Sequence, residues 1–391
     1  MVNIVKLLRD RTPLGLRQLS RDRTRLLTAI AGITFADVLI FMQLGFAAAL
    51  FKTNTQYPRT VAADLVLIST QAKNFGDLKT FPRRRLYQAL DVPGVASTDG
   101  VYIGQVQWRH PDTGNQTSLL LLGQNPDQSA FDLPLVTQQL ATLRLPDHVL
   151  FDQASRGGYQ SVIEQLQQGQ SVRTEVGLRT VTIGGLFKVG ASFADDGALI
   201  TSDQTFLRLV PRRDAGAISL GLVRLAPGAD PAQVQASLAD RLPADVQVFT
   251  HQGYIDFEVA YIQRTSPVGF VFSLGTIMGF VVGMVIVYQV LSTDVNSHLA
   301  EYATFKAMGY RNRYLLGVVF EEALILSILG FIPGLTIALG AYQLTAAATA
   351  LPIAMPLSRA AIVLVITLVM CNASGAIATR RLQAADPADI F

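Results

Sequence analysis

Four long apolar stretches constrain the fold of this chain more than any other feature of its sequence. The hydrocarbon core of a bilayer is about 30 Å thick and a helix rises about 1.5 Å per residue, so a membrane-spanning helix needs roughly 20 mostly apolar residues. The stretches that reach this length are residues 26–50, 268–291, 314–344 and 357–379. Only 16% of the 391 residues are charged, whereas a soluble protein has about 25%. The sequence therefore predicts an integral membrane protein with four transmembrane helices.

A long segment of ordinary soluble composition separates the first two stretches. Within residues 51–266, short apolar runs between Gly, Pro and Asp predict strands. Ser202 and Asp230-Pro231 are typical of helix starts, and helical spacing from Tyr254 onward predicts a stalk that leads into the second stretch. The predicted fold class is an α-helical membrane protein with one transmembrane helix before, and three after, a large mixed α/β domain.

Positively charged residues near the four stretches predict the orientation of the chain. Lys and Arg collect in short segments on the cytoplasmic side of membrane helices. They occur in the segments 1–25, 292–313 and 380–391. None occurs in residues 345–356, between the third and fourth stretches. We therefore expect a multi-pass membrane protein with both termini in the cytoplasm and with residues 51–266 and 345–356 on the outer side of the membrane.

The first stretch is interpreted as a retained helix, with cleavage as a signal peptide as the alternative. Its apolar part runs for 25 residues, 26–50, whereas the apolar region of a signal peptide has about 7–15. Ala47-Ala48-Ala49 does resemble a cleavage site. The length favours a transmembrane helix.

The segment after the second stretch, residues 292–313, has the pattern of a short amphipathic helix. Its apolar residues recur at spacings of three and four, and Gly309 is placed to end the helix. The recurring apolar residues are Val295, Leu299, Tyr302, Phe305 and Met308. Glu301 and Lys306 lie on its other faces. The pattern is compatible with a helix that lies on lipid, and equally with one that occupies a groove of a cytoplasmic partner.

The sequence contains none of the motifs that would give the chain an enzymatic site of its own. The phosphate-binding motif G-x-x-x-x-G-K-[ST], the nucleophile motif G-x-S-x-G and the zinc motif H-E-x-x-H are absent. The four histidines are far apart, and Asp195-Asp196 is interpreted as a solvated loop. The basic residues behind the net charge of +3 are dispersed, which argues against a nucleic-acid partner. We expect no catalytic, cofactor or metal site, so any ATP must bind to a partner.

Three acidic residues lie inside the predicted membrane helices, where charge is costly and therefore a candidate for function. Asp37 is near the middle of the first helix, and Glu321 and Glu322 are about two turns into the third. Asp37 has three interpretations: pairing across a dimer interface, facing an aqueous cleft, or a local hydrogen bond to Thr34 or Gln43.

Small residues predict how two of the membrane helices pack. Gly275, Gly279 and Gly283 recur every four residues, a pattern that permits close helix approach. The facing helix belongs either to the same chain or to a second copy, and ordinary glycine content of a membrane helix is the alternative. Pro333-Gly334 predicts a kink or a break in the third helix.

Several motifs together resemble one family of membrane proteins. Residues 301–310, with the sequence EYATFKAMGY, resemble the cytoplasmic signature of FtsX/MacB-type ABC transporter permeases. Further segments resemble the cyanobacterial DevC branch of that family: residues 23–36, 41–46, 279–283, 288–291 and 386–388. The likeness extends over the whole chain. Asp37 departs from it, because a small or apolar residue is expected there.

This resemblance implies a function and a set of partners. Such permeases are homodimers that bind two copies of a separate ABC ATPase, of the DevA or MacB kind, through the segment 292–313. The DevC branch works with a DevB-like periplasmic membrane-fusion protein and a TolC-like outer-membrane channel, and it exports a lipid or glycolipid. The alternatives are an FtsX-like subunit that activates a cell-wall hydrolase, and a sensor without a transport role.

Overall fold

The computed structural model describes residues 23–264, 267–298, 301, 304, 308 and 312–379. The chain divides into two compact units. A helical unit is formed by Met1–Ala48, Phe270–Leu344 and Ile353–Phe391. An α/β unit is formed by Ala49–Gly269 and Thr345–Pro352.

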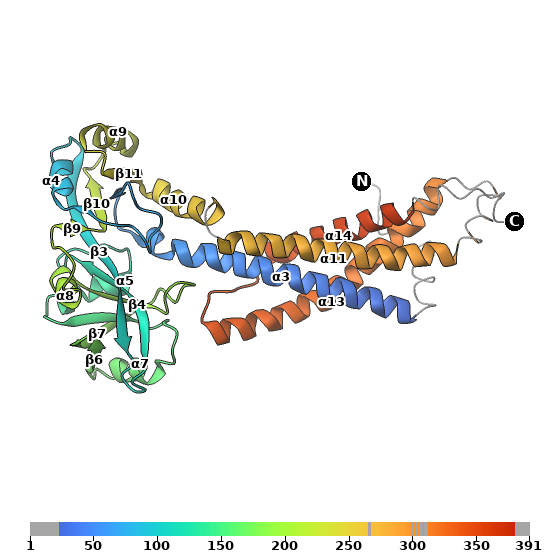
Figure 1. Ribbon diagram of the computed structural model, residues 1–391, viewed down its shortest axis with the longest axis horizontal. Coiled ribbons are helices and arrows are strands. Elements are labelled where there is room, and N and C mark those ends of the chain that lie inside the picture. The colour runs from blue at the N-terminus through green and yellow to red at the C-terminus, as the bar shows by residue number, and fades with distance from the viewer. Residues whose placement is uncertain are drawn as a thin grey trace. The chain divides into compact units, whose positions relative to one another are not determined.

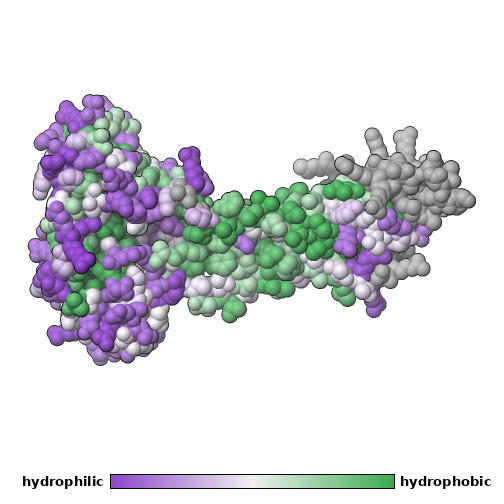
Figure 2. All heavy atoms as spheres, in the orientation of Figure 1, coloured by the Kyte–Doolittle hydropathy of each residue, from purple (hydrophilic) through white to green (hydrophobic). Residues whose placement is uncertain are grey.

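In the described part of the chain, four helices are long and apolar enough to cross a membrane. They are α3 (Arg23–Thr60), α11 (Pro267–Ser297), α13 (Asn312–Thr349) and α14 (Leu357–Ala378) (Figure 1). Figure 2 shows that the surface along these helices is largely hydrophobic. The prediction of four such helices together with a large α/β domain is confirmed.

The helices α3 and α11 are longer than the apolar stretches from which they were predicted. Beyond residue 50, α3 continues through a polar segment in which Thr53 and Asn54 hydrogen-bond to the Leu50 carbonyl. In the same way, Thr293 Oγ1 donates to the Gln289 carbonyl at 2.8 Å in the last turns of α11. In both extensions, polar side chains thus satisfy their hydrogen-bonding groups on the preceding turn of the same helix.

The third membrane helix continues through a proline. The α13 helix includes Pro333, where the sequence predicted a kink or a break. One turn earlier, Thr34 Oγ1 of α3 donates to the Gly330 carbonyl at 3.1 Å. A membrane helix tolerates proline where neighbouring helices provide such polar contacts.

The α/β unit is built on a nine-stranded mixed sheet with the order β11-β1-β10-β3-β4-β8-β5-β7-β6 (Figure 1). Its strands are β1 (Leu65–Ser69), β3 (Val95–Arg109), β4 (Gln116–Gln124), β5 (His148–Asp152), β6 (Val172–Val176), β7 (Arg179–Phe187), β8 (Ala198–Ser202), β10 (Leu220–Leu225) and β11 (Val246–Thr250). A small second sheet contains β2 (Phe81–Pro82) and β9 (Ala217–Ile218). The helices are α4 (Arg84–Leu90), α5 (Pro134–Gln138), α6 (Leu140–Leu143), α7 (Gln160–Gln167), α8 (Asp203–Leu209), α9 (Pro231–Arg241) and α10 (His251–Arg264).

The long strand β3 divides the sheet into two lobes. Its first half pairs with β10 and, with β1 and β11, forms what we name the first lobe. Its second half pairs with β4, and the pairing Trp108↔Val176 joins β3 to β6. The pairings β3-β4-β8-β5-β7-β6-β3 therefore close on themselves. We name this part, with the loops between its strands, the ring lobe.

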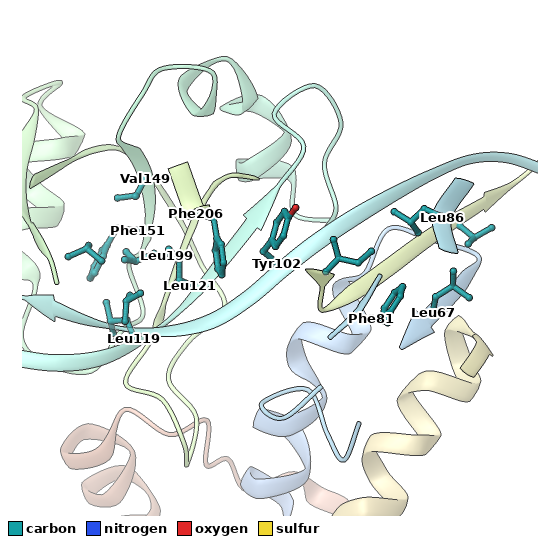
Figure 3. Packing of buried hydrophobic residues seen from close by; sticks show 14 of the residues in the cluster. Leu67, Phe81, Leu86, Tyr102, Leu119, Leu121, Val149, Phe151, Leu199 and Phe206 are labelled. Atoms are coloured by element: carbon teal, nitrogen blue, oxygen red, sulfur yellow. The ribbon is translucent and has the colours of Figure 1, made fainter. Parts of the chain in front are cut away.

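Apolar side chains from both lobes form a shared core. Figure 3 shows Tyr102 and Phe206 near the middle of this cluster, with Phe81 toward one end and Phe151 toward the other. The Tyr102 and Phe206 rings stack at a centroid distance of 5.4 Å. Burying one such ring stabilises the fold by about 1.5–3 kcal/mol, so this core holds the two lobes together around β3.

Two predicted helix starts are confirmed at atomic detail. Ser202 Oγ accepts a hydrogen bond from the Thr205 amide at the start of α8. Asp230 accepts one from the Ala232 amide at the start of α9, and Pro231 is its first residue. The predicted continuity of the stalk from α10 into α11 falls on residues 265–266, which lie outside the described residues.

Candidate functional site

The three predicted packing glycines face helices of the same chain. A Cβ atom on Gly279 would lie 3.0 Å from Ile40 Cγ1 of α3. One on Gly283 would lie 2.8 Å from Ala36 Cβ of α3 and would overlap Met370 of α14. Gly275 lies in the same way against Gln43 of α3. This side of α11 is thus in close contact with α3 and α14, and a larger side chain would push them apart.

A cluster of charged side chains joins three helices of the helical unit; we call it the carboxylate cluster. Arg25 of α3 donates from Nη1 to Asp294 Oδ1 of α11 at 2.8 Å and to Ser297 Oγ at 3.1 Å. His298 Nδ1 lies 3.6 Å from Asp294 Oδ2. Glu322 of α13 interacts electrostatically with Asp294, and both carboxyl groups are buried.

Because these acids are buried, the carboxylate cluster is sensitive to the substitution of any one of its members. Neither oxygen of Glu322 has a hydrogen-bond partner among the described residues, and the same holds for Asp294 Oδ2. Removing one member of a buried ion pair leaves the other charge uncompensated, at a cost of about 3–5 kcal/mol. Asp294 belongs to the predicted coupling segment, residues 292–313, and Arg25 contacts it from the start of α3.

The structure describes part of that coupling segment. Val295 is buried in the last turn of α11, whereas Glu301 and Met308 are exposed. The Met308 amide donates to the Thr304 carbonyl at 3.0 Å, the bond of a helical turn. The other predicted coupling residues lie outside the described residues: Leu299, Tyr302, Phe305, Lys306 and Gly309. The full amphipathic face stays a prediction.

Asp37 has a hydrogen-bond partner that the sequence did not suggest. Its carboxyl group is fully buried, and Thr367 Oγ1 of α14 donates to its Oδ1 at 2.6 Å. Its Oδ2 has no partner among the described residues. Thr34, one of the two expected partners, bonds to Gly330 instead.

Buried acids also occur in the α/β unit. Burial raises the pKa of Glu258, on α10, to about 8, although the Phe75 amide donates to this carboxyl and opposes the shift. Burial also raises the pKa of Asp152, at the end of β5, against hydrogen bonds from the Gly190, Ala154 and Val189 amides. Glu258 thus links the loop that carries Phe75 to α10, and Asp152 links the loop after β7 to β5.

The adjacent acids Asp195 and Asp196 are held by hydrogen bonds, whereas the sequence suggested a solvated loop. Gln105 Nε2 donates to Asp195 at 2.8 Å, and Arg156 pairs with Asp196 at 2.6 Å. Burial raises the pKa of Asp195. Among the described residues, no group of three or more His, Cys, Asp or Glu side chains is placed to hold a metal ion.

A cavity of about 720 Å³ lies on the ring lobe of the α/β unit. Its floor includes Gly184 and Gly185 of β7, at a bulge in the pairing with β5. Gln139 lies over these glycines, and its amide exchanges hydrogen bonds with the Leu186 backbone. The lining residues include no Asp, Glu, Lys or Arg.

Comparison with known protein families gives a match for the part of the chain that contains α13, α14 and most of α11. Residues 273–387 match the family described as FtsX-like permease C-terminal. The chain carries an FtsX-like permease domain. This domain contains α13, α14, most of α11 and the whole predicted coupling segment. Asp37 and the segment Ala49–Gly269 of the α/β unit lie outside it, whereas the segment Thr345–Pro352 lies inside it.

Comparison with solved structures gives weaker likenesses. The periplasmic region of MacB from Actinobacillus actinomycetemcomitans aligns at 11% identity over 53% of this chain and 95% of that one, with a TM-score of 0.35. The extracellular domain of the noncanonic ABC-type transporter YknZ from Gram-positive bacteria aligns at 13% identity over 48% and 99%, with a TM-score of 0.31. Both scores lie below 0.5, so neither likeness assigns a function to this chain. No curated protein matches the sequence.

Proposed function

We propose that this chain is the permease subunit of an ABC exporter of the MacB/DevC type. The observation that carries the proposal is the FtsX-like permease domain, residues 273–387. That domain contains the segment whose sequence resembles the ATPase-coupling signature of such permeases. The α/β unit, inserted between α3 and this domain, supplies the large body on which such a permease acts outside the membrane.

In this proposal the chain transmits force and does not hydrolyse ATP. Its sequence lacks a phosphate-binding loop, so a separate ATPase of the DevA or MacB kind supplies the energy. Closure of the ATPase moves the coupling segment, and α11 and α13 on either side of it carry that movement. The exposed Met308 is the described residue best placed to enter an apolar groove of the ATPase.

The remaining parts of the proposal come from the resemblance to the DevC branch. The permease would act as a homodimer in the inner membrane, with both termini in the cytoplasm. A membrane-fusion protein and a TolC-like channel would complete the assembly, and a lipid or glycolipid would be exported.

The test is copurification of the full chain with the ABC ATPase encoded nearest to it. We expect Met308→Asp to abolish ATPase binding and export, because a charged group does not enter an apolar groove. Leu178→Asp is the matched control, since Leu178 is fully exposed at the β6–β7 turn of the α/β unit. If both variants bind the ATPase and export like the wild type, the coupling role is wrong. Recovery of a cell-wall hydrolase in place of a membrane-fusion protein would favour the FtsX-like alternative.

A further inference from the structure

The chain enters and leaves the α/β unit through the first lobe. The helix α3 leads into β1, and β11 leads into α10 and then α11. Both strands belong to the first lobe and pair with each other. The ring lobe lies within the chain between them and is continuous with no membrane helix. A movement of a membrane helix can therefore reach the ring lobe only indirectly, through the first lobe and β3, or directly through contacts with that helix.

One such contact comes from the connection between the last two membrane helices. Residues Thr345–Pro352, which include the last turn of α13, belong to the α/β unit. Arg156, in the segment after β5, donates from Nε to the Thr349 carbonyl at 2.6 Å. Thr349 is the last residue of α13. The ring lobe thus supplies a cationic partner to the end of a membrane helix.

The same guanidinium holds the neighbouring loop of the ring lobe. Arg156 Nη1 donates to Asp196 Oδ1 at 2.6 Å, and Nη2 donates to the Ser192 carbonyl at 3.1 Å. The Asp196 carboxylate also accepts from Thr117 Oγ1 of β4 at 2.5 Å. All three guanidinium nitrogens are therefore engaged, and they join three segments that are distant in the chain.

Physical chemistry explains why an arginine suits this position. The last carbonyls of a helix have no partner within the helix, and a cation near that end is favoured by the helix dipole. The planar guanidinium can serve a carbonyl and a carboxylate at once, whereas the lysine ammonium acts as a point charge. Hydrogen bonds to charged groups are also stronger than neutral ones.

The same loop of the ring lobe contacts α3. Gln56 Nε2, in the last turns of α3, donates to the Gly190 carbonyl at 2.9 Å. The loop 190–196 is therefore bound by the ends of two membrane helices, by α3 directly and by α13 through Arg156. Of these two contacts, only the second depends on a charged side chain that is 35% exposed and has an acidic partner.

We propose that Arg156 is a positioning residue that fastens the end of α13 to the ring lobe, so that this lobe follows the third membrane helix. The part of the proposal that concerns transport rests on the permease function proposed above. The part that concerns the fastening does not. Arg156 would then couple movements of the FtsX-like domain to a lobe that has no membrane helix of its own.

The first test is hydrogen exchange on the full chain in lipid nanodiscs, which needs no ATPase. We expect Arg156→Ala to speed exchange about tenfold or more in residues 345–352 and 190–197 and to leave the rest of the sheet unchanged. Arg156→Lys should have a smaller effect. The control is Arg144→Ala, because Arg144 pairs with Asp127 on the same unit with side chains 62% and 70% exposed. Equal exchange in the Arg156→Ala and Arg144→Ala variants would overturn the proposal.

The second test is ATP-driven export with the partner ATPase present. We expect Arg156→Ala to retain ATPase binding and ATP hydrolysis but to lose most export, whereas Arg144→Ala exports normally. Normal export by Arg156→Ala despite faster exchange would reduce Arg156 to a stabilising residue and overturn the coupling. If no ATPase binds even the wild type, the proposed function fails, and the exchange experiment alone decides whether Arg156 fastens α13.

Discussion

At the scale of single residues, a nearly buried carboxyl group ties α10 to the loop that carries Phe75. Glu258 is 1% exposed and accepts a hydrogen bond from the Phe75 amide. The Phe75 ring in turn stacks on Tyr57 of α3 at 5.5 Å. Glu258 and Phe75 thus link α10 to α3 through one hydrogen bond and one ring contact.

The buried state of Glu258 predicts a pH dependence of stability. Its pKa is 4.5 by reference and about 8 in the folded protein. Between these values the folded state holds a proton that the unfolded state lacks, so the free energy of unfolding falls as the pH rises, by at most about 1.4 kcal/mol per pH unit. Below about 4.5 and above about 8 this group contributes no slope. We expect Glu258→Gln to remove this fall, as measured by thermal unfolding of the full chain across that range.

The matched control for this prediction lies on the same helix. Asp256 is exposed on α10 and accepts only from Gln252 among the described side chains. Asp256→Asn should keep the pH dependence of the wild type. A Glu258→Gln variant that loses stability with pH as steeply as the wild type would show that this carboxyl is not the titrating group.

The partners of buried acids show where sequence reasoning at this scale ends. The sequence identified Asp37 as a costly charge in a membrane helix, but its partner Thr367 lies 330 residues away. The Arg25–Asp294 pair spans 269 residues. Periodicity and composition report on neighbours within a few residues, and such long-range pairs are set by helix packing. The sequence therefore predicts which acidic residue is buried in a membrane helix, but it does not predict the partner of that residue.

At the scale of elements, hydropathy predicted the four membrane helices but not their ends. The extra turns of α3 carry Tyr57, which is buried against Phe75 and Phe131. The extra turns of α11 carry Asp294, which is held by Arg25. Both extensions depend on contacts with distant segments. The closure of the ring lobe through Trp108↔Val176 was likewise not predictable from local pattern.

Helix packing in the FtsX-like domain leads to a second prediction. We expect Gly283→Leu to destabilise the chain, because its side chain would overlap Met370 and Ala36, and overpacking of this kind costs about 1–3 kcal/mol. Gly340→Leu on α13 is the control, since a Cβ there meets no atom within 4 Å. The measurement is the thermal midpoint of the detergent-solubilised protein. Equal midpoints for the two variants would contradict the close packing of α11.

The end of α13 gives a prediction in which one substitution has opposite effects at nearby positions. Ala350 follows the last residue of α13 with a φ of 53°, a left-handed conformation that costs a residue with a side chain about 1–2 kcal/mol. Ala350→Gly should therefore stabilise the protein. Ala348→Gly, inside the same helix and exposed, should destabilise it by about 0.5–1 kcal/mol. Thermal unfolding of both variants checks the signs, and a loss of stability in Ala350→Gly would contradict the left-handed helix end.

At the scale of the whole molecule, the proposed function requires the α/β unit and the coupling segment to lie on opposite sides of the membrane. The chain order supports this arrangement, because α11 separates the two and is apolar enough to cross once. An odd number of crossings puts the ends of a segment on opposite faces. If the α/β unit and the coupling segment lay on the same side of the membrane, a cytoplasmic ATPase could not drive movement of the ring lobe on the opposite side.

Thiol labelling tests that arrangement directly. The single cysteine, Cys371, is fully buried in α14, so an added cysteine is the main site for a membrane-impermeant maleimide. Leu178 and Met308 are both exposed and belong to the α/β unit and to the coupling segment. We expect Leu178→Cys to react in intact spheroplasts and Met308→Cys to react only after permeabilisation. Reaction of both from the same side would contradict the topology. Such a result would remove the basis for force transmission across the membrane, because the ATPase and the ring lobe would then lie in one compartment.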